Sequence, residues 1–252
     1  MTASGVVNKR IIHTESGEMT FELDMAAGQV EILLEDRERA EVLLEPLVAG
    51  DEIAADLISR TLHVSRGPVL DLRMPHPEPT VLSGSGNTTA RGVGGGGVKV
   101  TARLPHGSRL KATTVSANVA ANEYLPTADF ESTSGDLYVF STDRLGARTI
   151  SGEVSVDTAD RVDVETTSGD VTIGEANDIR ARTVSGDIDA GRLTGSCAQL
   201  TSTSGRVDVF ASCDAEVTAR TVSGDIRITA HDGAHVNARA TSMSGRVRIP
   251  RN

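Results

Sequence analysis

Apolar and polar residues alternate along much of this chain, and the alternation itself recurs. From about residue 110 onward, short segments place Val, Ile, Leu or Ala two positions apart on both sides of a Ser-Gly pair. A period of two is the pattern of a β-strand with one buried face. The segment Thr-Val-Ser-Gly-Asp-Ile at residues 183–188 shows the unit most clearly, and versions of it occur eight times. The C-terminal half is therefore predicted to consist of strands joined by one recurring turn.

The eight versions are nearly evenly spaced. Their central serines, at positions 116, 134, 151, 168, 185, 204, 223 and 244, are 18, 17, 17, 17, 19, 19 and 21 residues apart. A near-constant period predicts stacked repeats, in which each inward Val or Ile contributes about 1.5 to 3 kcal/mol once its neighbours bury it. We predict an all-β fold, a parallel β-helix-like solenoid of about eight coils of 17–21 residues.

The residues three positions before these serines indicate how many repeats make one turn. Glu131, Arg148, Glu165 and Arg182 occupy this position in four consecutive repeats. With one repeat per turn, adjacent turns lie about 4.8 Å apart and opposite charges alternate. With two repeats per turn, like charges would stack, which is unfavourable. We therefore predict one repeat per turn.

The polar positions of the repeat predict structural roles. A Gly after the Ser suits either a positive φ or a close approach of two backbones. The first repeat has Ala117 instead, so either its coil turns differently or Asn118 takes the unusual conformation. Two positions before each serine stands a hydroxyl residue, which predicts a ladder of side chains hydrogen-bonded to one another. These residues are Thr114, Ser132, Thr149, Thr166, Thr183, Ser202, Thr221 and Ser242.

The first hundred residues lack this repeat. We predict that residues 1–97 form a β-rich cap region with one short helix, and that residues 98–252 form the solenoid domain. Residues 83–97 contain four consecutive glycines and almost no apolar residue, which predicts a flexible loop. A ligand-binding loop with Arg91 as an anion partner is the alternative, although no phosphate-binding glycine motif is complete there.

Within the cap region, an alternating strand is followed by a predicted turn at residues 26–28. Residues 29–34 and 40–45 are predicted to pair as a hairpin. Residues 51–60 suit a helix, because Asp51 can cap its start. The apolar side of this helix would consist of Ile53, Leu57 and Ile58.

The composition limits which partners and which cellular compartment fit this chain. Only 2% of the residues are aromatic and none is Trp, so the core must be aliphatic. A net charge of -10 argues against a nucleic-acid partner. The two cysteines, Cys197 and Cys213, fit a reducing compartment without a disulfide. The sequence contains neither a secretory signal nor an apolar run long enough to span a membrane, so we expect a cytoplasmic location.

Several polar groups could carry chemistry, and a structural role is favoured for each. A column of acids after the glycines would suit a Ca²⁺ row or a glycosidase carboxylate pair, but Arg206 and Arg246 interrupt it and few aromatics are available to hold a sugar. His231 and His235 fall in a loop, and no serine has the surroundings of a nucleophile. We therefore predict no catalytic, cofactor-binding or metal-binding residue. The acids are Asp136, Glu153, Asp170, Asp187 and Asp225.

The recurring Thr-x-Ser-Gly-Asp-Ile/Val motif, with the Pro-His-Gly turn at residues 105–107, resembles a bacterial family of β-strand-repeat proteins labelled "putative adhesin", a domain of unknown function. The resemblance covers residues 98–249 strongly and the first hundred loosely. It implies a parallel solenoid and no known catalytic residues. We expect a non-enzymatic structural or interaction protein that contacts an unknown protein partner or itself. The alternatives are a polysaccharide-acting β-helix enzyme and a self-polymerising solenoid of the cytoskeletal type.

Overall fold

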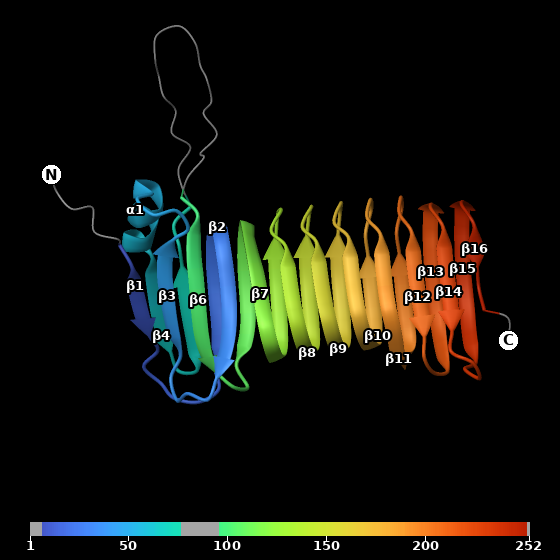
Figure 1. The fold of residues 1–252 in the computed structure, drawn as a ribbon, viewed down its shortest axis with the longest axis horizontal. Coiled ribbons are helices and arrows are strands. Elements are labelled where there is room, and N and C mark those ends of the chain that lie inside the picture. The colour runs from blue at the N-terminus through green and yellow to red at the C-terminus, as the bar shows by residue number, and fades with distance from the viewer. Residues whose placement is uncertain (1–6, 77–95, 251–252) are drawn as a thin grey trace, which may run out of the picture.

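Stacked coils make up most of the molecule (Figure 1). The structure is a computed structural model and describes residues 7–76 and 96–250. Within these ranges, sixteen strands join into one sheet that winds into a β-solenoid of about seven turns. The predicted all-β solenoid is confirmed, and the expected number of coils, about eight, is close to the observed one.

Each coil contributes to two faces. Face 1 consists of the segments that follow the Ser-Gly pairs, and face 2 of the segments that precede them. In the first coils one long strand bends from face 1 to face 2, whereas in the last coils each face has its own strand. The long strands are β7 (Arg109–Ser132), β8 (Leu137–Thr149), β9 (Val154–Thr166), β10 (Val171–Arg182) and β11 (Ile188–Thr201). Face 1 continues with β12 (Val207–Ala211), β14 (Ile226–Ala230) and β16 (Val247–Arg248), and face 2 with β13 (Ala215–Ser223) and β15 (Val236–Ser244).

Neighbouring coils pair in parallel, and the pairing places one repeat on the next. Arg148 of β8 is the register partner of Glu165 of β9. Its guanidinium lies 3.8 Å from Glu131 and 3.6 Å from Glu165, and Arg182 lies 3.7 Å from Glu165 on the other side. One repeat therefore makes one turn, as the alternation of charge predicts. These side chains are mostly exposed, so each pair adds less than about 1 kcal/mol.

An aliphatic core lies between the two faces. The predicted inward residues are buried, for example Val154, Val171 and Ile188, which are at most 1% exposed. The last predicted pair differs, because Val247 and Ile249 are 40% and 52% exposed. Within the described residues no further coil packs over them. The predicted alternation of apolar and polar residues is therefore present in this last pair, but its apolar side chains are not buried.

The N-terminal end is closed by strands that change direction. β2 (Thr20–Glu35) pairs in parallel with β7 and extends both faces. Face 1 continues through β6 (Val98–Pro105), β3 (Glu41–Pro46) and β1 (Lys9–Ile12), with antiparallel pairing from β6 onward. Face 2 continues through β5 (Val69–Arg73) and the antiparallel β4 (Leu62–Arg66). A 3.1 Å hydrogen bond between His13 Nδ1 and Ser65 Oγ joins the two faces at this end.

Two predictions for this region are wrong. Residues 29–34 and 40–45 do not form a hairpin, because β6 pairs between β2 and β3. Residues 26–28 do not end a strand, because β2 runs through them. Gly28 has a φ of 144° and passes so close to Val98 of β6 that a Cβ would overlap the Val98 carbonyl oxygen. Gly28, which has no Cβ, therefore permits a close approach of two backbones within a continuous strand.

The predicted helix is confirmed as α1 (Glu52–Arg60). Asp51 Oδ1 accepts hydrogen bonds from the backbone N–H groups of Ile53 and Ala54 at 2.9 and 3.1 Å, and Oδ2 accepts one from Gly96 at 2.7 Å. The bond from Gly96 is the largest cause of the lowered pKa of Asp51. Ile53, expected on the buried side, is instead 43% exposed. The buried residues of α1 are Ala54, Leu57 and Ile58. Across the described ranges, no helix is long and apolar enough to cross a membrane.

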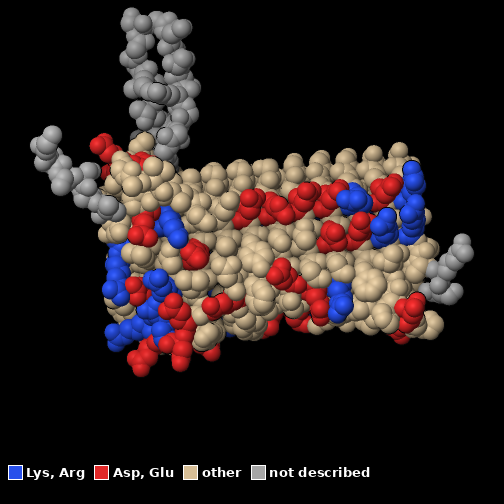
Figure 2. Space-filling model, in the orientation of Figure 1, with Lys and Arg blue, Asp and Glu red and all other residues tan. Residues whose placement is uncertain are grey.

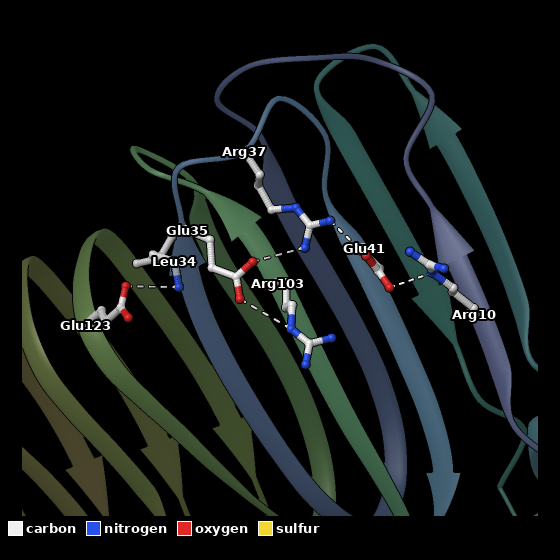
Figure 3. Close-up of polar contacts among 7 residues, drawn as sticks. All are labelled: Arg10, Leu34, Glu35, Arg37, Glu41, Arg103 and Glu123. Atoms are coloured by element: carbon white, nitrogen blue, oxygen red, sulfur yellow. Dashed lines mark hydrogen bonds and ion pairs between the residues drawn. The ribbon is translucent and has the colours of Figure 1, made fainter.

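Ion pairs fasten the loop between β2 and β3 to the strands around it (Figure 3). Glu41, at the start of β3, pairs with Arg10 of β1 and, at 2.8 Å, with Arg37 of the loop. Both arginines lower the pKa of Glu41, and Arg10 contributes most. Glu35, at the end of β2, pairs with Arg103 of β6 at 3.3 Å and with Arg37 at 3.4 Å. The network thus ties four face 1 strands, β1, β2, β3 and β6, to one loop.

The turn from face 2 to face 1 brings the backbones of successive coils into close contact. At each Gly after a Ser, a Cβ would overlap the carbonyl oxygen of the corresponding residue in the preceding coil. None of these glycines has a positive φ. Of the two predicted explanations for the recurring place of Gly in the repeat, the close approach of two backbones is therefore the correct one. Ala117 lies within the continuous strand β7, and no described non-Gly residue has a positive φ. The first coil therefore turns differently, and the alternative of an unusual Asn118 is wrong.

Replacing Gly169 by Ala is expected to destabilise the protein by about 3 kcal/mol, because the new methyl group would overlap the Gly152 carbonyl and push two coils apart. The free energy of unfolding, measured by urea denaturation, checks this. Ser168→Ala changes the exposed neighbouring residue and should alter that free energy by less than about 0.5 kcal/mol. Equal stability of G169A and the wild type would contradict close backbone contact at the turn.

Glu41→Gln is expected to lower the free energy of unfolding at neutral pH by about 1 to 2 kcal/mol, because it removes the charge that faces Arg10 and Arg37. The folded-state pKa of Glu41 lies below its ordinary value of 4.5. The stability from its ionised form is therefore present above that ordinary value and is lost as pH falls through the lowered pKa.

Urea unfolding at a series of pH values tests this dependence. The difference in unfolding free energy between the wild type and E41Q should shrink on acidification. Glu38→Gln, in the same loop, serves as the control and should differ little from the wild type. A wild-type advantage over E41Q that stays constant across the series would rule out the ion pairs as its origin.

Candidate interaction surface

The turns between face 2 and face 1 stack into an exposed ridge. We define the ridge as the Ser of each repeat together with the residue before it. Successive turns are joined through their backbones: Ser151 N–H donates to Thr133 O at 2.9 Å, and Ser168 N–H donates to Ile150 O at 2.7 Å. The ridge is therefore held in place along its length. The residues before the serines are Val115, Thr133, Ile150, Thr167, Val184, Thr203, Val222 and Met243.

The ridge is uncharged and partly apolar. None of its residues carries a charge, and the upper edge of the solenoid is accordingly tan in Figure 2. Ile150, Val184 and Met243 are 54%, 47% and 81% exposed. Because 24% of the whole chain is charged, a continuous row of uncharged exposed side chains sets this edge apart from the rest of the surface.

The hydroxyl residues beneath the ridge bind the backbone of the turn rather than one another. Thr149 Oγ1, for example, accepts a hydrogen bond from Gly152 N–H at 3.0 Å. In other coils the hydroxyl donates to the glycine carbonyl of the preceding coil. Among the described residues of this column, Thr114 and Ser132 alone bond directly, at 2.9 Å. The predicted ladder is therefore wrong beyond its first step, because the N–H and C=O groups of the turn are the nearer partners.

The acids after the glycines connect neighbouring coils on face 1. Asp136 Oδ1 accepts from Glu153 N–H at 2.9 Å, and Asp170 Oδ1 accepts from Asp187 N–H at 2.8 Å. Asn118 does the same for Asp136 N–H at 3.0 Å, so an uncharged amide oxygen also fills this role. The column is thus more than a set of solvated turn residues, because it fixes the start of successive face 1 strands.

The negative charge of this column is largely unneutralised. In the part of the chain that the structure describes, Asp136, Glu153 and Asp170 form no ion pair, and Asp187 pairs with Arg206 at 3.3 Å. Figure 2 shows a row of red side chains below the tan upper edge, and the acids of this column follow two positions after the ridge serines. One column of face 2 differs, because Glu131 and Glu165 alternate with arginines that pair with them.

Three of the six aromatic residues of the chain lie at neighbouring positions on this side of the solenoid. Tyr138 and Phe140 are two apart on β8, and Tyr124 of β7 is the register partner of Ser141, next to Phe140. Tyr124 is 47% exposed and Phe140 is 49% exposed, whereas Tyr138 is half-buried. We call Tyr124, Tyr138 and Phe140 the aromatic patch.

Each tyrosine of the aromatic patch reaches the next coil. Tyr124 OH donates to Asp143 Oδ2 at 2.7 Å, and Tyr138 OH donates to Asp157 Oδ2 at 2.8 Å. In both cases the acid is 19 residues further along the chain, two beyond the register partner of the tyrosine. These hydrogen bonds are the largest cause of the raised pKa of both phenols, and they fix the position of both rings.

A bulge in β7 lies beside the aromatic patch. The register with β8 shifts between Ala121 and Tyr124. Glu123, within the bulge, accepts a hydrogen bond from the backbone N–H of Leu34 in β2 at 3.1 Å (Figure 3). The carboxylate thus satisfies a donor where the strand-to-strand pairing is interrupted, and it ties the patch to the cap.

A hollow of about 300 Å³ adjoins the aromatic patch on face 1. Tyr138, Ala120, Asp136 and Glu153 are among the residues that line it. Ala120 is the register partner of Tyr138 in the preceding coil, and its small side chain leaves room beside the ring. The hollow therefore combines an aromatic ring with two carboxylates that lack an ion-pair partner among the described residues.

The remaining candidates from the sequence do not form a site together. His231 and His235 lie in the turn between β14 and β15, with His231 Nδ1 2.9 Å from Asp232 O. Cys197 and Cys213 are free thiols, as expected. Nowhere in the described ranges do three or more His, Cys, Asp or Glu residues form a group that could hold a metal ion.

The predicted Gly-rich loop lies mostly outside the described residues. Residues 83–95 and Arg91 are not described, so the ligand-binding alternative for this loop stays a prediction.

The aromatic patch is a site that the sequence analysis does not predict. The signal for it was the repeated separation of Tyr and Asp by one repeat plus two residues.

Comparison with known proteins adds a family and relatives of the same fold. The model of a family described as Toastrack DUF4097 matches residues 78–252. A solved "putative adhesin" from Parabacteroides distasonis has a TM-score of 0.65 at 16% identity, with 98% of each chain covered. One from Parabacteroides merdae has a TM-score of 0.62 at 14% identity, covering 99% of this chain and 98% of the other.

A third structure, titled a "putative lipid binding protein" from Parabacteroides distasonis, has a TM-score of 0.64 at 12% identity, with 98% of each chain covered. At these identities the likeness shows the fold alone. Among curated proteins, no sequence matches this chain.

Asp170→Ala is expected to lower the free energy of unfolding by about 1 kcal/mol, because Asp187 N–H loses its acceptor. Asp170→Asn should stay close to the wild type, since Asn118 fills the same role with an amide oxygen. Urea unfolding of the three proteins measures both effects. An Asn variant as unstable as the Ala variant would mean that the charge of the column, rather than its hydrogen bond, stabilises the coils.

Proposed function

The chain belongs to the Toastrack DUF4097 family, and from that premise we propose that it is a non-enzymatic interaction protein that holds a partner protein along the ridge. The observation that carries the proposal is the uncharged ridge, with Ile150 and Val184 about half exposed. Exposed apolar side chains gathered along one uncharged edge, rather than scattered singly over the surface, support contact with another molecule.

The rigidity of the ridge supports the same proposal. Backbone hydrogen bonds between successive turns fix its side chains in a row. A surface that is already ordered loses little conformational entropy when a partner binds, so more of the contact energy appears as affinity. The titles of the structural relatives, two "putative adhesins" and a "putative lipid binding protein", also name binding rather than catalysis.

Two charges placed on the ridge test the proposal. The wild type and the Ile150→Asp/Val184→Asp double variant serve as baits for affinity purification from cells of the source organism. Recovery of a specific partner should fall at least about tenfold with the double variant, because a charge buried in an apolar contact lacks a counterion. Both replaced side chains are exposed, so unfolding free energies should stay within about 0.5 kcal/mol per site of the wild type.

The matched control adds the same charge elsewhere. Gln199→Glu/Thr241→Asp changes two exposed positions of face 2 and should recover as much partner as the wild type. Retention of the partner by the ridge variant, or failure of the wild-type bait to recover any specific partner, would overturn the proposal. Sedimentation of the purified protein shows whether the partner is a second copy of the chain, in which case the ridge variant sediments as a smaller species.

A further inference from the structure

The aromatic patch is an unexpected use of scarce residues. The chain has two Tyr, four Phe and no Trp. Two of the phenylalanines, Phe21 and Phe130, are buried in the core, whereas the aromatic patch takes both tyrosines and Phe140 to the surface. Large rings contribute most to the core when buried, so rings left exposed and held in place are typical of binding surfaces.

The environment of the patch is acidic. The phenols are bonded to Asp143 and Asp157, and Asp136 and Glu153 line the adjoining hollow. All four carboxylates lack an ion-pair partner among the described residues. On face 2, in contrast, Glu131 and Glu165 pair with Arg148, so the four acids around the patch differ from this column of face 2 in lacking a cationic partner.

We propose that the aromatic patch and the adjoining hollow bind the basic side chains of an extended segment of a partner protein. A guanidinium or ammonium group over the face of Tyr138 or Phe140 would be attracted by the ring. A group over Tyr138, which lines the hollow together with Asp136 and Glu153, would also provide their missing counterion, and a second basic side chain of the extended segment would stack on Phe140. The net charge of -10 also favours the approach of a cationic partner over an anionic one.

This inference rests on the proposed function and specifies the chemistry of the partner. Asp136 and Glu153 each stand two residues after a ridge serine, so the hollow adjoins the ridge. A partner that lies along the ridge could therefore place a neighbouring basic segment on the patch. Neutral sugars also stack on aromatic rings, but they would leave the carboxylates without a counterion.

Fluorescence anisotropy with a labelled peptide of alternating Arg and Gly tests the inference on the full chain. Binding is expected for the wild type at low ionic strength and should weaken as salt is added. Phe140→Ala and Glu153→Gln should each weaken it by about three- to tenfold. Both side chains are exposed, and urea unfolding of each variant confirms that it folds.

Two matched controls separate the patch from general acidity. Phe210→Ala removes an aromatic ring on β12, outside the patch, and Glu165→Gln removes an acid on face 2. Both should bind the peptide within about twofold of the wild type. Equal weakening of peptide binding by Glu153→Gln and Glu165→Gln would show that the peptide responds to the overall charge of the protein and not to the patch, and would overturn the inference.

Two further outcomes would also overturn it. One is the absence of peptide binding to the wild type. The other is binding of a neutral oligosaccharide, maltohexaose, that is lost in Phe140→Ala while peptide binding is unaffected. The ridge variant I150D/V184D should bind the peptide like the wild type. Peptide binding therefore tests the patch, and affinity purification tests the ridge, so that either proposal can fail without the other.

Discussion

The backbone of each coil lies directly against the backbone of the next at the ridge, and the rest of the solenoid depends on this contact. Where Gly152 and Gly169 meet, there is no room for a Cβ. This spacing lets the aliphatic residues of successive coils pack into one core. It also brings the N–H of one coil within reach of the carboxylate of the preceding one, as between Asp170 and Asp187.

Polar residues of the repeat therefore serve folding as much as the apolar ones do. The hydroxyl of Thr149 satisfies the N–H of the turn, the glycine permits close approach, and the acid holds the next coil. A buried or half-buried N–H without a partner would cost about 1 to 3 kcal/mol. A motif that resembles a row of chemically active groups is thus explained by the hydrogen bonds of the turn, which leave the outward residue before each Ser without a structural task.

Features that repeat at a fixed period could be predicted from the sequence, and features that depend on a single distant pairing could not. The column of Glu131, Arg148 and Glu165 fixed the coil size because each charge constrains its neighbour one repeat away. The place of β6 between β2 and β3 had no such signal, because alternation shows which side of a strand is buried but not which strand lies beside it. The column of hydroxyl residues shows which side chains stack, but not that the N–H and C=O groups of the turn are their nearer partners, as for Thr149 and Gly152.

The same limits apply to the candidate surface. The ridge follows from the repeat, since its position in the turn is fixed by the Ser-Gly pair. The aromatic patch does not, because its tyrosines occur in β7 and β8 alone. In the following coils the position of Phe140 holds Asp157, Gly174 and Gly191, and Phe210, which occupies it in β12, has Asp208 rather than a tyrosine two residues earlier. A single departure from a repeat is visible in the sequence, but its exposure and its hydrogen bonds to Asp143 and Asp157 required the fold.

The character of the ridge carries information because folding leaves it free. In the repeat, the hydroxyl, the glycine, the acid and the inward aliphatic each have a structural task, but the residue before the Ser points outward. Charged side chains at the same coil spacing are compatible with the fold, as the alternating pairs of Arg148 on face 2 show. The stability of the solenoid therefore does not require Val, Ile, Thr or Met at Ile150, Val184 and their equivalents. An uncharged row at positions where the fold would tolerate charge is therefore the feature on which the proposed contact with a partner protein is based.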